Sequence, residues 1–134
     1  GTAARKSSVW LGFHNEPNHQ KPINGVVPLD LFIGRTDPGV VRLQLDAGNM
    51  RMGGGDPLKF LKEHHDRIWS FHLKDVVADN SRDTELGVGT VDFGAMLALV
   101  QDLDKKPCVV EQEGSAAPME SARRNLRFMR DLRF

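Results

Sequence analysis

The chain has 134 residues, and its 18 basic side chains balance its 18 acidic ones. Apolar residues make up 40% and charged residues 27% of the sequence, which excludes a disordered or fibrous protein. Zero net charge disfavours a dedicated nucleic-acid binder, and no apolar run approaches the roughly 18–20 residues of a membrane span. A complete (β/α)8 barrel needs about 250 residues, so the chain is too short for one.

Short β-rich runs alternate with helical patterns along the whole chain. Four strands are predicted, over residues 8–14, 40–46, 68–73 and 108–111. Each precedes a helical pattern, over residues 29–35, 56–65, 92–100 and 118–132. Four such units in 134 residues correspond to about 33 residues each, the size of one βα repeat. The alternation predicts a parallel sheet with right-handed crossovers.

The two faces of these strands differ in character, because alternate side chains point to opposite sides of a sheet. One face is almost wholly apolar and is predicted to pack beneath the helices: Val9, Leu11, Phe13, Val41, Leu43, Leu45, Trp69, Phe71, Leu73, Cys108 and Val110. The other is mostly polar or small: Trp10, Gly12, His14, Arg42, Gln44, Asp46, Ile68, Ser70, His72, Val109 and Glu111. The last helix is predicted from an apolar stripe that repeats at helical spacing: Met119, Ala122, Leu126, Met129 and Leu132.

Each predicted strand finishes with a potential metal ligand: His14, Asp46, His72 and Glu111. In parallel α/β proteins the loops at these strand ends build the active site. One such residue alone is more often structural, but four at the same place in successive units favour a metal site. Two carboxylates and one or two imidazoles suit a single divalent cation, Mn²⁺, Mg²⁺, Co²⁺ or Zn²⁺.

Five short phrases carry a family resemblance. They are LGFHN (11–15), LDAGN (45–49), FHLKD (71–75), ELGVG (85–89) and VEQE (110–113). In order and spacing they resemble strands five to eight of the sugar phosphate isomerase/epimerase family, the xylose isomerase-like TIM barrels. The resemblance implies half of a (β/α)8 TIM barrel, with residues 1–134 forming a single C-terminal half-barrel domain of about four parallel βα units.

The resemblance also implies the ligands of one divalent metal ion. Asp46, His72 and Glu111 take the positions of the family ligands on strands six to eight, and His14 takes that on strand five. Relatives often have His-Asn-His at strand five, whereas this chain has His14-Asn15-Glu16. Glu16 therefore remains a second-choice ligand or a proton-transfer group.

The implied activity is that of an isomerase or epimerase on a small sugar or sugar phosphate, which moves a proton through an enediolate. Glu111 would be both ligand and acid/base, and Glu16 the second proton-transfer group. Lys74 would stabilise the developing oxyanion, or else be a solvated loop lysine. The same groups would also serve a dehydratase or lyase on a keto-sugar or keto-inositol. A further alternative is a non-catalytic half-barrel remnant.

A parallel arc of four strands leaves two bare edges, which proteins normally pair or cover. It also leaves Trp10, Ile68 and Val109 uncovered, which forfeits on the order of 5–8 kcal/mol. A domain's whole stability is only about 5–15 kcal/mol. We therefore expect a homodimer, or completion by an N-terminal half of the same protein. The single cysteine, Cys108, excludes an internal disulfide and fits a reducing, cytoplasmic location.

Overall fold

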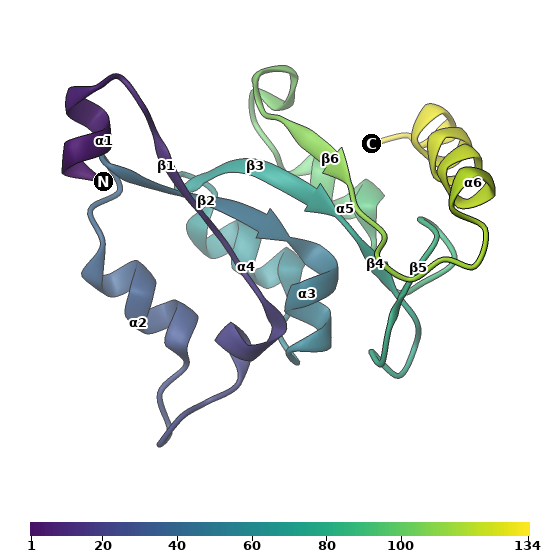
Figure 1. Ribbon diagram of the computed structural model, residues 1–134, viewed down its shortest axis with the longest axis horizontal. Coiled ribbons are helices and arrows are strands. Elements are labelled where there is room, and N and C mark those ends of the chain that lie inside the picture. Colours follow the sequence, from purple (N-terminus) through teal and green to yellow (C-terminus); the bar gives the residue numbers. More distant parts are fainter.

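The computed structural model describes residues 1–134, and its central feature is a four-stranded parallel sheet (Figure 1). The strand order is β1–β2–β3–β6, so each strand pairs with its neighbours in chain order. The strands are β1 (Leu11–His14), β2 (Val41–Asp46), β3 (Ile68–Leu73) and β6 (Cys108–Val110). This arrangement confirms the predicted α/β fold and is consistent with half of a (β/α)8 barrel.

Six α-helices accompany the sheet: α1 (Thr2–Lys6), α2 (Pro28–Arg35), α3 (Ala47–Met52), α4 (Pro57–His64), α5 (Phe93–Ala98) and α6 (Pro118–Asp131). Shorter elements are the 3-10 turns η1 (Pro17–Gln20) and η2 (Leu103–Lys105) and the hairpin of β4 (Asp75–Val76) and β5 (Asp83–Thr84). Asp56 caps α4 by accepting two backbone N–H groups, and Asp92 caps α5 by accepting one. These caps confirm the predicted helix starts. None of these helices combines the length and the apolar character of a membrane-spanning segment.

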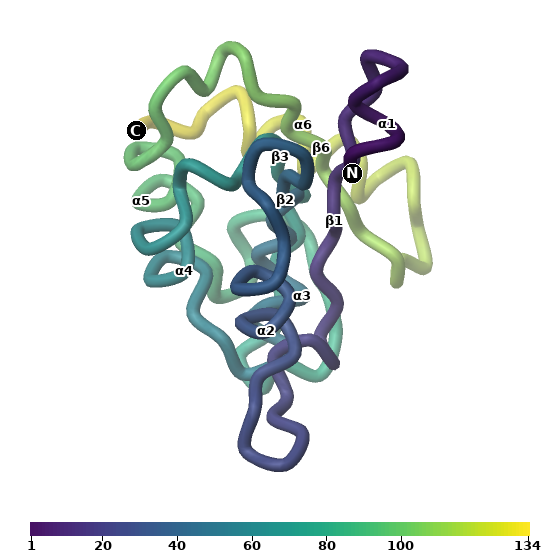
Figure 2. The backbone as a smooth tube through the Cα atoms, turned by 90° about the vertical axis from the view of Figure 1, so that its left-hand side faces the viewer, coloured from purple at the N-terminus to yellow at the C-terminus, as the bar shows by residue number.

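The hydrophobic core lies between the sheet and the helices packed on one of its faces. Figure 2 shows α4 and α5 together on one side of the strands. Buried core residues come from α2, the two inner strands β2 and β3, and helices α4 and α5: Leu29, Leu43, Leu45, Phe60, Leu61, Ile68, Phe71, Leu73, Phe93, Met96 and Leu97. Burying this many large apolar side chains stabilises the helical layer against the sheet. The site described below lies at one end of this layer.

One residue of β3 reverses the predicted facing at the start of that strand. Leu43 pairs with Ile68 and Gln44 with Ser70, so Trp69 is left over in a β-bulge. Ile68 therefore points into the core and is 1% exposed, whereas Trp69 is 37% exposed. The prediction that Ile68 is uncovered and that Trp69 packs beneath a helix is wrong. Alternation resumes at Ser70, which leaves His72 on the predicted face.

The edge strands are less covered than the sequence predicted. Val9, which lies just before β1, and Leu11, its first residue, are exposed, and so are Cys108 and Val110 on β6. The prediction that these four residues pack beneath helices is wrong, because each edge strand has a neighbour on one side only. Val109, on the other face, is exposed as expected.

Helix α6 stands beside β6, and its predicted apolar stripe is only partly used (Figure 1). Met119, Ala122 and Leu126 are exposed, while Ser121 and Asn125 are the buried residues of the helix. The Asn125 side-chain oxygen accepts the backbone N–H of Leu86, while Phe128, Met129 and Leu132 pack against the core. A groove of about 430 Å³ separates α6 from β6, and its apolar lining is Val110, Pro118, Ala122, Leu126 and Met129.

Candidate metal centre

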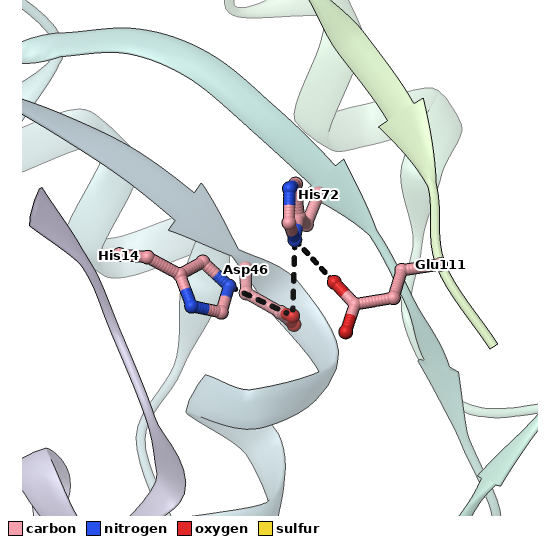
Figure 3. A group of neighbouring side chains, drawn as sticks. All are labelled: His14, Asp46, His72 and Glu111. Carbon is pink, nitrogen blue, oxygen red and sulfur yellow. Dashed lines mark hydrogen bonds and ion pairs between the residues drawn. The ribbon is translucent and has the colours of Figure 1, made fainter. Parts of the chain in front are cut away.

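Four side chains from four separate segments meet at the C-terminal end of the sheet (Figure 3). They are His14 at the end of β1, Asp46 at the end of β2, His72 on β3 and Glu111 directly after β6. Each offers one nitrogen or oxygen atom, and these atoms all lie within 4.8 Å of one another. The structure thus brings together the four residues that the sequence singled out.

The distances within this group suit a shared cation. His14 Nε2 lies 3.3 Å and His72 Nδ1 3.9 Å from the same Asp46 oxygen, Oδ2. His72 Nδ1 also contacts Glu111 Oε2, and both of these atoms are shielded from solvent. A cation bound between these two atoms would be a shared partner for both. Two imidazoles and two carboxylates fit one divalent cation.

Asp46 is the most rigidly held of the four and is 0% exposed. Its Oδ1 accepts the backbone N–H of Asn49 at 2.7 Å and caps α3, which leaves Oδ2 facing the centre. The Asn15 side chain accepts the backbone N–H of Asp46 at 2.8 Å and donates to its carbonyl at 3.0 Å. The sequence missed α3 and the buried asparagines, because a six-residue helix has almost no periodic signal.

Glu16 supports His14 from outside the group. Its Oε1 lies 3.2 Å from His14 Nδ1, the nitrogen that points away from Asp46. Its Oε2 accepts a hydrogen bond from Asn49 Nδ2 at 3.1 Å. A carboxylate on the outer nitrogen of a ligating histidine fixes the ring and raises its basicity. The hydrogen bond that His14 donates to Asp46 raises the pKa of His14, and burial offsets this only in part.

Lys74 is buried beneath the group rather than solvated in a loop. It is 1% exposed, and its Nζ lies 3.0 Å from Glu111 Oε1 and 2.9 Å from Glu113 Oε1. Burial alone would lower the pKa of Lys74, but the bond to Glu113 and the charge of Asp46 outweigh it and raise that pKa. Burial would raise the pKa of Glu111, but the hydrogen bond and charge of Lys74 lower it. Sequence reasoning gave no role to Glu113.

The family assignment rests on a sequence match that covers almost the whole chain. Residues 1–132 match the sequence profile of the family described as xylose isomerase-like TIM barrel. The chain belongs to this family. A sugar phosphate isomerase/epimerase from Parabacteroides distasonis has the same fold, with a TM-score of 0.75 and 22% identity over 90% of this chain and 45% of that one. The "probable 3-DHS dehydratase AsbF" from Bacillus anthracis also has a TM-score of 0.75, at 14% identity, over 97% of this chain and 52% of its own.

Curated proteins similar in sequence to this xylose isomerase-like chain include inosose dehydratases. That of Salmonella typhimurium is 27% identical over 115 residues, which are 73% of this chain and 38% of the relative. That of Lacticaseibacillus casei is 30% identical over 76 residues, which are 57% of this chain and 25% of the relative. The chain thus spans less than half the length of the curated relatives it matches.

Two further carboxylates hold the loops around the centre of this xylose isomerase-like half-barrel. Asp75 is 0% exposed and accepts backbone N–H groups from Val76, Gly87, Gly89 and Val91 at 2.9–3.0 Å. Asp83 accepts the backbone N–H groups of Glu113 and Gly114, which fixes the segment after β6. Beside Lys74 opens a cavity of about 330 Å³, lined by Met52, Lys74, Ser81, Arg82, Asp83, Glu113 and Gly114.

Proposed function

We propose that residues 1–134 form the C-terminal, metal-binding half of an enzyme that acts on a small sugar or sugar phosphate by isomerisation or epimerisation. The observation that carries this proposal is the group of His14, Asp46, His72 and Glu111 at the strand ends. One divalent ion, Mn²⁺, Mg²⁺, Co²⁺ or Zn²⁺, would be held by these four residues. When bound, such an ion polarises adjacent carbonyl and hydroxyl oxygens and stabilises negative charge that develops on them.

The protein groups around the ion have separate tasks in this proposal. Glu111 removes or returns the proton next to the substrate carbonyl, because its carboxylate is kept ionised by Lys74. Lys74 supplies fixed positive charge where the enediolate develops. Glu16 holds the ring of His14 and is the second proton-transfer group. The cavity beside Lys74 has room for a small polyhydroxy compound.

A dehydratase is the second candidate, and the relatives favour it. Removal of the same proton is followed there by loss of a hydroxide from the neighbouring carbon, so a keto-sugar or keto-inositol would lose water. The curated relatives described above are inosose dehydratases, at 27–30% identity. Both candidates share the first step, which is the removal of a proton adjacent to a carbonyl. A non-catalytic remnant would bind the ion and lack this step.

We propose that the active form includes a second half-barrel, either another copy of the chain or an N-terminal half of the same protein. The solved relatives are about twice as long as the matched region. Both edge strands expose apolar side chains, among them Leu11 and Val109. Of the two, we favour a homodimer closed around a two-fold axis. Light scattering from the purified chain should give the mass of a dimer, and a well-folded monomer would contradict this part of the proposal.

The shared first step can be tested without knowing the product. The metal-loaded protein is incubated in D₂O with a panel of keto-sugars, sugar phosphates and keto-inositols, and NMR follows deuterium uptake next to the carbonyl. We expect uptake with at least one compound, loss of uptake in Glu111→Gln, and full uptake in Glu63→Gln, an exposed carboxylate on α4. Metal binding without uptake from any compound would favour the non-catalytic remnant. New signals of an isomer or of a dehydrated product separate the two enzymatic candidates.

A further inference from the structure

The ammonium of Lys74 has the surroundings of a bound metal ion. Its Nζ lies 2.9 Å from Glu113 Oε1, 3.0 Å from Glu111 Oε1 and 3.1 Å from Asn49 Oδ1, with Asp46 Oδ2 at 3.6 Å. All four neighbours are oxygen atoms, and three belong to carboxylates. An ammonium has three N–H donors, and the three nearer oxygens use all of them.

Two of these carboxylates also belong to the candidate metal centre. Glu111 presents Oε2 to His72 and Oε1 to Lys74. Asp46 Oδ2 lies between the two histidines on one side and Lys74 on the other. Carboxylates that bridge two neighbouring cations are the usual construction of two-metal sites, in which the ions lie about 3.5–4 Å apart. The oxygen-only set around Nζ is the type of site that hard divalent cations prefer.

The backbone is shaped to admit this lysine. A Cβ atom on Gly48 would lie 2.5 Å from Lys74 Cγ and 2.7 Å from its carbonyl oxygen, so the lysine stem runs directly over α3. Burying an ammonium is unfavourable unless it is paired and hydrogen-bonded, as it is here. The side chain is therefore built into the centre.

We propose that the Lys74 ammonium occupies the place of a second divalent cation and thereby keeps the centre mononuclear. This inference rests on the proposed metal centre, and it concerns the number of ions bound rather than the reaction. In this role Lys74 is a positioning residue, since its three donors already hold Glu111, Glu113 and Asn49. Removing the charge of Lys74 leaves the carboxylates of Asp46, Glu111 and Glu113 with room for a cation of higher charge.

Metal stoichiometry tests the inference. Calorimetric titration with Mn²⁺, together with electron paramagnetic resonance, is applied to the wild type and to Lys74→Met, which keeps the apolar stem and removes the charge. We expect one ion in the wild type. We expect two ions in Lys74→Met, with the spectrum of a coupled pair. Lys74→Arg, which keeps a cation, and Lys105→Met, which removes an exposed lysine, should each bind one.

Glu113 gives an independent check, because it contacts Nζ but no residue of the four-ligand group. In Lys74→Met with Glu113→Gln the second ion should bind at least tenfold more weakly than in Lys74→Met, with the first unchanged. Thermal unfolding of Lys74→Met should respond to a second equivalent of Mn²⁺, whereas the wild type responds only to the first.

The outcomes separate the inference from the proposed function. A wild type that binds no ion contradicts the proposed metal centre itself. One ion in both the wild type and Lys74→Met contradicts the inference alone. Two ions in the wild type also overturn it, since Lys74 would then exclude nothing. Failure of Lys74→Met to fold in excess Mn²⁺ counts against it too, because a second cation should replace the lost charge.

Discussion

Two glycine-to-alanine substitutions, both within helices, should change stability in opposite directions. Gly48 lies in α3 and Gly34 in α2. In the middle of a helix alanine is more favourable than glycine by about 1 kcal/mol. A Cβ at Gly34 has no atom within 4 Å, and Gly34 lies in the last turn of α2, so Gly34→Ala should raise the free energy of unfolding by up to about 1 kcal/mol.

Gly48→Ala should instead be destabilising. The new Cβ would lie 2.5 Å and 2.8 Å from two carbons of Lys74 and 2.7 Å from its carbonyl oxygen. Optimal carbon–carbon separations are about 3.5–4.0 Å, so the end of β3 must shift by roughly 1 Å. Overpacking of this kind costs about 1–3 kcal/mol. Because the shift displaces Lys74 and Glu111 with it, metal affinity should also fall.

Urea unfolding at 25 °C measures both changes, and the same titration with Mn²⁺ measures the second effect of Gly48→Ala. We expect the unfolding midpoint to fall for Gly48→Ala and to rise for Gly34→Ala, with unchanged m values. A Gly48→Ala protein as stable as Gly34→Ala would refute the close approach of Lys74 to α3. The proposed path of the lysine into the centre would then be wrong as well.

Three further predictions concern the loops and the metal. Asp75→Asn replaces one of two oxygens that each accept two backbone N–H groups, so it should lose about 3 kcal/mol of unfolding free energy, whereas the exposed Asp79→Asn should leave stability unchanged. Mn²⁺ affinity should weaken as pH falls through the raised pKa of His14, by up to tenfold per pH unit, because the ion must displace a proton. An Mn²⁺ affinity that does not change between pH 8 and pH 5 would contradict this. His72→Ala should abolish Mn²⁺ binding while His65→Ala, an exposed residue, leaves it intact in calorimetry.

Much of the fold was predictable because it rests on local patterns. Strands with apolar alternation, helices started by Asp or Pro, and polar residues at the strand ends are all written within a few neighbouring positions. Parallel pairing then places the ends of successive strands side by side. His14, Asp46, His72 and Glu111 converge for this reason, with no need for knowledge of distant contacts.

The features that escaped prediction depend on contacts between distant segments. The bulge at Trp69 is visible only in the register between β2 and β3. The burial of Asn125 on α6, where its side chain accepts the backbone N–H of Leu86, is not encoded in a helical pattern. Asn49 and Glu113 both accept a hydrogen bond from Lys74, which lies 25 positions from the first and 39 from the second in the sequence. Sequence spacing alone gives no signal for such pairs.

The most direct test of the metal centre is anomalous X-ray diffraction from crystals of the chain grown with Mn²⁺ or Zn²⁺. We predict one strong anomalous peak at the C-terminal end of the sheet, about 2.0–2.3 Å from one atom each of His14, Asp46, His72 and Glu111. A peak elsewhere would contradict the account. So would well-ordered side chains of His14, Asp46, His72 and Glu111 that hydrogen-bond to one another with no peak between them at saturating metal.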